Sequence, residues 1–239
     1  MKSVLISEKI KSSYIKNHAL FRQLDEEQFR ELCSRAKLIK LKRNDPFLLN
    51  SEPQGRVFFI GSGTAKLVQF NGSGHDLVKE ILVDGELFGD FSFVGSNIDG
   101  YVTGLRSNTF MFYFTSSDLK KILQRNHTMS LNYMEMVSMK LRQLEARHSV
   151  WTSKDARLRL LYFFQGWASC AGTRTANSVI LENYFALTDI AEFIGVTRQF
   201  MHTMLNELKE EGLLNYSRKQ IEVSNSFLEQ DIEKQKLTG

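Results

Sequence analysis

The chain has 239 residues, of which 42% are hydrophobic and 24% are charged, and this composition excludes a largely disordered protein. Its formal net charge of +4 permits nucleic-acid binding without requiring it. No apolar run approaches the roughly 18 residues of a membrane span, and charges interrupt the N-terminal segment every few positions. We therefore expect no membrane span and no signal peptide, and we expect the protein in the cytoplasm.

The only two cysteines, Cys33 and Cys170, lie far apart and form no CxxC pattern. This arrangement provides no ligand set for a zinc site or an iron-sulfur cluster and no disulfide framework. We interpret both as buried thiols, because free cysteine commonly packs as a small hydrophobic residue.

The N-terminal half is predicted to contain a helical segment followed by a β body. Residues 1–36 are expected to be helical, because acids in a first turn of DEEQFRELCSRAKLI precede apolar residues at helical spacing. From about 37 to 115, short β-branched and aromatic runs alternate with Gly, Asn, Asp and Ser, which is typical of an all-β barrel or jelly-roll-like body. The stretch NGSGHD at 71–76 predicts a hairpin loop.

A long helix without Gly or Pro is predicted from about 127 to 148. Apolar residues and one histidine recur along it at alternating three- and four-residue steps: Met134, Val137, Leu141, Leu144 and His148. Such a seam is typical of two helices lying together, so we predict a two-fold dimer. The alternative is that the seam packs on the β body of its own chain.

Residues 187–208, LTDIAEFIGVTRQFMHTMLNEL, are predicted to form two helices with almost nothing between them. Thr188 is expected to cap the first helix and Thr197 the second, and Gly195 supplies the left-handed residue that ends the first. Five apolar side chains are expected to point inwards: Ile190, Ile194, Met201, Met204 and Leu205. This pattern predicts a helix-turn-helix with a recognition helix at about 197–210.

The outer face of the second helix carries residue types suited to DNA. Arg198 and Gln199 are of the types that contact guanine and adenine edges with two hydrogen bonds. Thr203 is expected to contact a base or a phosphate, and Thr197 and His202 are expected to contact phosphate. These five residues are the candidate contacts of the recognition helix.

The stretch GLLNYSRKQIEV follows directly and predicts a hairpin with Arg218 and Lys219 at its tip, which resembles a wing contacting the DNA backbone. Residues 151–219 hold eight Lys and Arg against seven Asp and Glu, so any DNA contact depends on the placement of individual cations. An alternative interpretation is a ligand-binding or adaptor module whose helical end binds protein rather than DNA.

The order of a β body, one long helix and a winged helix-turn-helix resembles the Crp/Fnr family of bacterial transcription regulators. The segments that carry the resemblance are LTDIAEFIGVTRQFMHTMLNELKEEGLL at 187–214, DGELFGDFSFVG at 84–95 and RVFFIGSGTAKL at 56–67. The resemblance implies a homodimer on an inverted-repeat DNA operator, with RNA polymerase as a partner if the protein is an activator.

The implied fold is α+β, with an N-terminal double-stranded β-helix, or jelly-roll-like β-roll, before the other two parts. We predict the β-roll at 1–125, the dimerisation helix at 126–149 and the winged helix-turn-helix domain at 150–239.

The family's nucleotide-binding members carry a Gly-Glu pair and, about ten residues later, an Arg-Ser pair that holds the cyclic phosphate. This chain keeps Gly89 but has Asp90, and its later stretch NIDGYVTG lacks Arg and Ser. A buried phosphate would lose a charge-assisted contact, so cyclic AMP in the family's usual pose is not expected. Arg142 and Gln143 are further candidates for an unidentified small-molecule effector, and the sequence identifies no cofactor.

An enzyme built on the β body is a rival interpretation that the sequence disfavours. Of the five histidines only His75 lies in the barrel region, where a glycine loop is expected to expose it. A three-ligand metal site cannot be assembled there, and no nucleophile–base pair is recognisable. The sequence therefore predicts neither a catalytic nor a metal site.

Overall fold

The structure is a computed structural model that describes residues 8–43, 45–50, 55–70, 76–93, 98–152 and 155–230. The chain divides into two compact units, Met1–Lys140 and Leu141–Gly239. The division falls inside the longest helix, α4 (His127–Trp151). The domain boundaries predicted at 125/126 and 149/150 stay a prediction.

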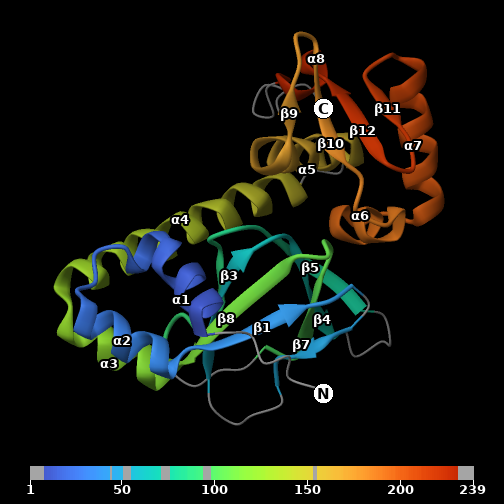
Figure 1. The fold of residues 1–239 in the computed structure, drawn as a ribbon. Helices are drawn as coiled ribbons and strands as arrows, with labels where there is room; N and C mark the ends of the chain where they lie inside the picture. The colour runs from blue at the N-terminus through green and yellow to red at the C-terminus, as the bar shows by residue number, and fades with distance from the viewer. Residues whose placement is uncertain are drawn as a thin grey trace. The chain divides into compact units, whose positions relative to one another are not determined.

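The first unit combines a two-sheet β body with helices before and after it (Figure 1). Its elements before α4 are α1 (Glu8–Asn17), the 3-10 helix η1 (Ala19–Phe21), α2 (Glu26–Arg35), β1 (Lys37–Leu41), β2 (Phe47–Leu48), β3 (Arg56–Ser62), β4 (Ala65–Phe70), β5 (Asp76–Leu82), β6 (Leu87–Gly89), β7 (Gly100–Gly104), β8 (Thr109–Thr115) and α3 (Ser116–Arg125). The strands form two antiparallel sheets, in the orders β1-β8-β3-β6 and β2-β7-β4-β5. The prediction of a jelly-roll-like β-roll is confirmed.

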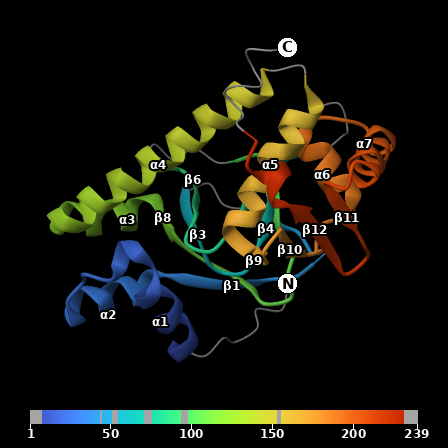
Figure 2. The same ribbon diagram turned by 90° about the horizontal axis from the view of Figure 1, so that it is seen from above.

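Successive side chains of a strand point to opposite faces of its sheet. In the sheet β1-β8-β3-β6 both faces are buried. In β3, Phe58 and Ile60 point into the core between the two sheets, whereas Val57 and Phe59 point into a core shared with the helices. α1, α2 and α3 cover this second face (Figures 1 and 2). A near-continuous apolar run in β3 therefore reflects burial on both sides.

Aromatic rings fill much of the interior between the sheets. Phe58 stacks on Phe88 with 4.8 Å between ring centroids, and Tyr113 lies 5.3 Å from Phe58. The guanidinium carbon of Arg56, a residue only 3% exposed, lies 5.1 Å from the centroid of Tyr113. The cation is thus inside the β-roll and lies over an aromatic face.

His18 joins the N-terminal helices to the β-roll. Its Nδ1 accepts a hydrogen bond from the Leu20 N–H at 3.3 Å, and its Nε2 lies 3.1 Å from the carbonyl oxygen of Gly85. The ring is buried against Phe21 and Phe59. Burial disfavours the charged imidazolium and lowers the pKa of His18 to about 4.

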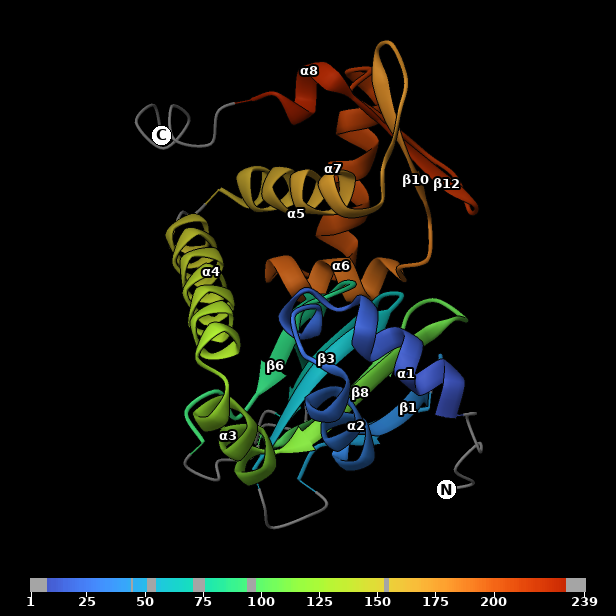
Figure 3. The same cartoon turned by 60° about the vertical axis from the view of Figure 1, so that its left-hand side comes forward.

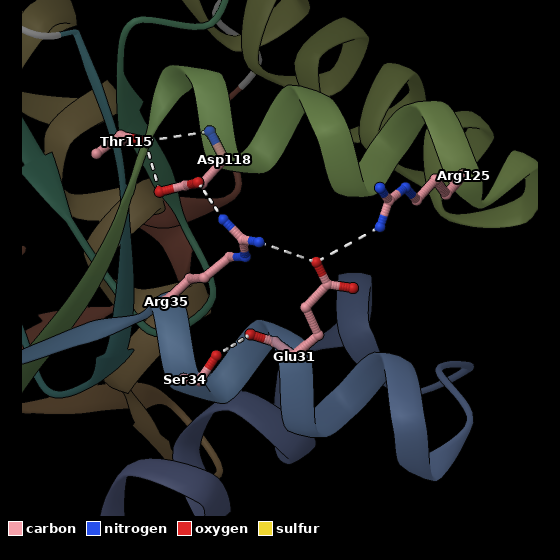
Figure 4. A network of polar contacts seen from close by, with 6 residues as sticks. All are labelled: Glu31, Ser34, Arg35, Thr115, Asp118 and Arg125. Atoms are coloured by element: carbon pink, nitrogen blue, oxygen red, sulfur yellow. Dashed lines mark hydrogen bonds and ion pairs between the residues drawn. The ribbon is translucent and has the colours of Figure 1, made fainter.

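A polar network holds α2 against α3, as Figure 4 shows. Arg35 donates to Asp118 at 2.6 Å and to Glu31 at 3.2 Å, and Arg125 pairs with the same Glu31 at 3.6 Å. Asp118 also accepts from the hydroxyl of Thr115, whose side chain caps α3. The network joins α2 and α3, which are far apart in the sequence, at the surface.

The middle of α4 is held against the β-roll by a partly buried ion cluster. Lys140 on α4 is 6% exposed, pairs with Glu80 on β5 and lies 3.8 Å from Glu86. Burial raises the pKa of Glu86, while the Lys140 charge and the Val83 N–H oppose the rise. Removal of Lys140 would leave two partly buried carboxylates without their cation, which is costly.

The second unit contains the end of α4 and a compact domain of helices around a small sheet. Its elements are α5 (Ala156–Ala171), β9 (Thr173–Arg174), β10 (Ser178–Glu182), α6 (Leu187–Ile194), α7 (Arg198–Glu210), β11 (Leu214–Tyr216), β12 (Gln220–Ser224) and α8 (Asn225–Leu228). The strands form an antiparallel sheet in the order β11-β12-β10-β9. In the view of Figure 3, α6 and α7 are steeply inclined to each other.

An aromatic cluster connects the end of α4 to α6 within this unit. The guanidinium carbon of Arg147 lies 4.9 Å from the centroid of Trp151 and 4.4 Å from that of Phe193, and the two rings are 5.5 Å apart. Trp151 also meets Tyr162 of α5 edge to face. The last turns of α4 are therefore packed into the helix-turn-helix domain.

The two cysteines differ in exposure. Cys33 is buried, but Cys170 is exposed near the end of α5, so the prediction that both thiols are buried is wrong for Cys170. The apolar face of α5 is occupied by aromatic side chains, and Cys170 falls on the other side. His75 and the loop residues 71–75 lie outside the described residues; β4 and β5, which flank them, pair as a hairpin.

Candidate nucleic-acid interface

The turn between α6 and α7 has the geometry that the sequence predicts. Gly195 adopts φ 72° and ψ 44°, the left-handed conformation that glycine tolerates best. Its N–H donates to the carbonyl of Glu192 at 3.2 Å, and the Val196 N–H donates to the carbonyl of Ala191 at 2.9 Å. These bonds satisfy carbonyls at the end of α6 and fix the direction in which α7 leaves.

The first helix begins two residues earlier than a Thr188 cap requires. α6 starts at Leu187, and the flanking residue is Ala186, so the prediction of a Thr188 cap is wrong. The carboxylate of Asp189 accepts a hydrogen bond from the Ala186 N–H at 3.3 Å and does part of what a capping side chain would do. Thr188 is exposed in the first turn.

The second helix begins as predicted. Thr197 is its N-cap, and the Thr197 hydroxyl accepts from the Phe200 N–H at 3.1 Å. The inner face of α7 is buried through Met201, Met204, Leu205 and Leu208, each at most 5% exposed. Ile190 and Ile194 of α6 are buried as well, so all five predicted inward positions are confirmed.

The outer face of α7 presents the predicted contact residues to solvent. Thr197, Arg198, Gln199, His202 and Thr203 are all exposed. The backbone N–H groups of the first turn and the positive end of the helix dipole lie at the same end, where they favour an anion such as phosphate. The structure therefore brings these five side chains together on one end and one side of α7.

Contacts within α7 orient two of these side chains. The hydroxyl of Thr203 donates to the carbonyl of Gln199 at 3.3 Å, and Nδ1 of His202 lies 3.2 Å from the amide nitrogen of Asn206. Asn206 is exposed one turn further along α7 and was not among the predicted contacts. Its type and helical spacing were visible in the sequence, but only the structure shows the pairing with His202.

α5 fixes both helices of the motif. Arg157 donates from its two terminal nitrogens to the two oxygens of Glu211, at 2.8 and 2.5 Å, just beyond the end of α7. This pair lowers the pKa of Glu211 and raises the pKa of Arg157. Arg159 donates to the carbonyl of Ile194 at 2.7 Å, at the end of α6.

The predicted hairpin is present, with Arg218 and Lys219 exposed between β11 and β12. The Ser217 hydroxyl donates to the Gln220 carbonyl at 2.7 Å and accepts from the Gln220 N–H at 3.1 Å, which closes the tip. Asn183 binds the tip from outside, by donating its side chain to Ser217 and its backbone N–H to Lys219. The backbone that carries the two cations is thereby held in place.

A polar hollow of about 450 Å³ lies at the opposite end of α7. It is lined by residues that include Lys209, Gly212, Asn215 and Glu222. Arg198 is the first residue of α7 and the hollow is at the last turn, so the hollow is separate from the exposed residues of the first turn.

The predicted effector residues lie in different units. Gly89 has φ +109°, and a Cβ there would lie 2.3 Å from the carbonyl oxygen of Arg56, so only glycine fits. Asp90 is 1% exposed, and its N–H donates to the same carbonyl at 2.8 Å. Arg142 and Gln143 are exposed on α4 in the second unit.

The surroundings of Asp90 are polar and tightly packed. The Ser92 hydroxyl donates to its carboxylate at 3.2 Å. Burial and then the Asp90 charge raise the pKa of the Tyr133 phenol well above its ordinary value. At the start of β7, in the other sheet, a Cβ on Gly100 would lie 2.0 Å from the carbonyl oxygen of Val68.

The seam on α4 is largely exposed. Met134 is 55% exposed, Leu141 56% and Leu144 41%, and His148 is exposed too. Val137 differs, since it is half-buried against the core beneath the helical layer. An exposed apolar row of this length is unusual for a surface that faces only water.

Two further observations concern the part of the chain that the structure describes. The described residues contain no group of three or more His, Cys, Asp or Glu side chains placed to bind a metal ion. None of the helices in this part of the chain combines the length and apolar character needed to cross a bilayer.

Comparisons with known proteins define the class. No family model matches the chain. The global nitrogen regulator of Nostoc sp. is 24% identical over 192 residues, which cover 76% of this chain and 82% of the relative.

Two solved structures share the fold. CooA from Carboxydothermus hydrogenoformans, solved as a mutant, has a TM-score of 0.66 at 20% identity and covers 86% of this chain and 88% of its own. FixK2 from Bradyrhizobium japonicum has a TM-score of 0.65 at 16% identity, with 80% and 92% covered.

The β-roll, the long helix and the helix-turn-helix with its hairpin define a two-unit protein with the architecture of a bacterial regulator. The relatives and the shared fold confirm the resemblance to the Crp/Fnr regulators that the sequence shows. The Nostoc relative is named as a regulator, in agreement with the prediction that the chain is not an enzyme.

Proposed function

We propose that the protein is a homodimeric, sequence-specific transcription regulator that binds an inverted-repeat DNA operator through α7. The observation that carries this proposal is the outer face of α7, where five polar side chains are exposed beside a capped helix N-terminus. Arg198 and Gln199 supply base contacts, and Thr197, His202 and Thr203 supply phosphate or further base contacts.

The hairpin adds contacts that do not depend on sequence. Arg218 and Lys219 are exposed at a tip whose backbone is held by Ser217 and Asn183. Cations on a fixed backbone contact DNA phosphates at low entropic cost, because little chain freedom is lost on binding.

Dimerisation uses the exposed seam of α4. Met134, Leu141, Leu144 and His148 form its outer part, and Val137 contributes from a half-buried position. A second copy of the same helix covers these apolar side chains in a two-fold arrangement. The dimer presents two copies of α7 to one DNA duplex.

The β-roll is the sensory part, and its effector is a small molecule other than cyclic AMP in the family's usual pose. Gly89 and Asp90 retain the position of the family's Gly-Glu pair, and Arg142 and Gln143 stay candidates on α4. RNA polymerase is a further partner if the protein activates transcription, and the chain acts in the cytoplasm. A thermal-shift screen of cyclic nucleotides and metabolites would identify the effector, because a ligand of the folded state raises the melting temperature.

The central test is DNA binding as a function of salt. We expect the full-length protein to select a two-fold sequence from random duplexes, and its affinity for that sequence to fall steeply as salt rises. A protein with Arg198→Ala and Lys219→Ala should lose much of this affinity. Lys16→Ala, which removes an exposed charge from the first unit, is the matched control and should bind normally.

Failure to enrich any sequence would contradict the proposal. In that case the alternative of a protein-binding adaptor would account better for the exposed face of α7.

A further inference from the structure

Phe200 is an exposed aromatic residue in the first turn of α7. It is 51% exposed, and its neighbours Arg198 and Gln199 are exposed in the same turn. Among the described residues from 155 to 230, it is the only large hydrophobic side chain that is exposed. Every other large apolar side chain of that domain is at least partly covered by the fold.

The position of Phe200 does not follow from the needs of the fold. The buried face of α7 is already complete, with Met201, Met204, Leu205 and Leu208. Phe200 supports the helix through its backbone, whose N–H donates to the Thr197 hydroxyl. A polar side chain at this position would leave both the cap and the core intact and would avoid exposed apolar area.

The chemistry of the DNA major groove identifies an apolar group that Phe200 can meet. The base edges in that groove present hydrogen-bond donors, acceptors and one apolar group, the C5-methyl of thymine. The first turn of a recognition helix is the part that contacts base edges. An aromatic ring among Arg198 and Gln199 therefore adds an apolar contact to two polar ones.

We infer that Phe200 is a specificity-determining residue that contacts a thymine methyl group in each operator half-site. The inference rests on the proposed DNA-binding function and extends it, because it assigns thymine recognition to a side chain outside the polar contact set. Arg198 and Gln199 would then select the bases beside that thymine.

The test uses a probe that lacks only the methyl group. The operator is first selected with the wild-type protein, and each thymine of one half-site is then replaced in turn by deoxyuridine. The replacement keeps every hydrogen-bonding group of the base edge. We expect one position at which the wild type loses about fourfold in affinity, as burial of one methyl-sized group implies.

Three variants make the assignment specific. In Phe200→Ala, deoxyuridine at that position should cause no further loss, whereas Phe200→Leu should retain part of the sensitivity. Glu210→Ala, at the exposed far end of α7, is the control and should behave as the wild type. Circular dichroism and melting temperature of each variant report whether the helix is intact.

The outcomes separate this inference from the proposal beneath it. A wild type that selects no DNA sequence would overturn the DNA-binding function and this inference together. A selected operator on which wild type and Phe200→Ala respond equally to every deoxyuridine would overturn this inference alone. Unchanged DNA binding by Phe200→Ala would likewise assign the exposed ring to another partner.

Discussion

Arg198 and Lys219 represent two kinds of contact on the proposed DNA surface. Arg198 is in the first turn of α7, where a guanidinium can make two hydrogen bonds to one guanine. Lys219 is exposed at the hairpin tip, where its ammonium group would contact phosphate. Removal of the two side chains should therefore have different signatures.

We expect Arg198→Ala to cost about 1 to 3 kcal/mol on the preferred operator and to relax selectivity at one base pair. Lys219→Ala should weaken binding to all sequences similarly and should lower the slope of log affinity against log salt by about 1. Anisotropy titrations on operator and scrambled duplexes at several salt concentrations measure both effects. A parental level of selectivity in Arg198→Ala would argue against base contact by this residue.

His18 makes the stability of the first unit depend on pH. Its folded pKa of about 4 lies below the ordinary 6.5, so the folded state favours the neutral ring. The stabilisation is fully present above pH 6.5 and is lost as the pH falls towards 4, with an upper limit of about 3 kcal/mol.

We expect this part of the acid sensitivity to be absent from His18→Gln. Urea unfolding of both proteins between pH 7 and pH 4 would isolate it, because all other titrating groups are common to the pair. Parallel pH profiles would show that His18 does not titrate in this way.

At the scale of the element, the α6–α7 turn depends on backbone geometry alone. A Cβ at Gly195 would meet no atom within 4 Å, but φ is +72°, so a side chain brings conformational strain without a clash. Gly195→Ala should destabilise the second unit by about 1 kcal/mol.

Gly166 provides a matched control for this substitution. It lies inside α5, and a Cβ there also meets nothing within 4 Å. Because its conformation is helical, Gly166→Ala should stabilise by roughly 0.5 to 1 kcal/mol. Thermal melts of the two variants should thus shift in opposite directions, and a shift of equal sign would contradict the account.

The seam of α4 makes a prediction about assembly. Leu144→Asp introduces a charge into the exposed apolar row, and the desolvation of that charge should favour the monomer. Ala146→Asp places the same charge elsewhere on the exposed part of the helix and serves as the control. Sedimentation velocity over a range of protein concentrations distinguishes monomer from dimer; a Leu144→Asp dimer as stable as the control would exclude this seam.

Prediction from the sequence succeeded where the spacing of apolar residues or a glycine determines the local structure. The inward positions of α6 and α7 follow from a helical repeat, and the turn follows from a residue that tolerates positive φ. Thr188 shows the limit, because the Asp189 carboxylate binds the Ala186 N–H and the helix begins earlier than the threonine implies.

Contacts between distant residues were beyond prediction. Nothing near Ser217 in the sequence indicates that Asn183, 34 positions away, fixes the hairpin tip. Cys170 is exposed because aromatic side chains occupy the inner face of α5, which the general tendency of cysteine to be buried does not reveal. The same limit applies to the buried pairing of Lys140 with Glu80.

At the scale of the whole molecule, the proposed function requires two copies of α7 on one side of a duplex. Successive major grooves on one face of B-DNA are about 34 Å apart, so we expect operator half-sites centred about one helical turn apart. Insertion of about five base pairs between them turns the second half-site to the opposite face. Binding should then fall to the affinity of a single half-site.

The spacing experiment needs only the selected operator and its lengthened version, compared by gel shift at one salt concentration. A scrambled spacer of the original length controls for sequence effects between the half-sites. Equal affinity for both spacings would mean that the two recognition helices are not held at a fixed separation.

The lack of space for a side chain at Gly100, beside the Val68 carbonyl, has a consequence for redesign of the β-roll as a sensor. The backbones of β7 and β4 are hydrogen-bonded neighbours at this point. Substitution of Gly100 by arginine, to bind a phosphate, would therefore force the two strands apart. An engineer who wants a nucleotide switch from this scaffold would have to bring the anion-binding group from a different strand. Main-chain packing thus restricts which side chains this position of the β-roll can carry.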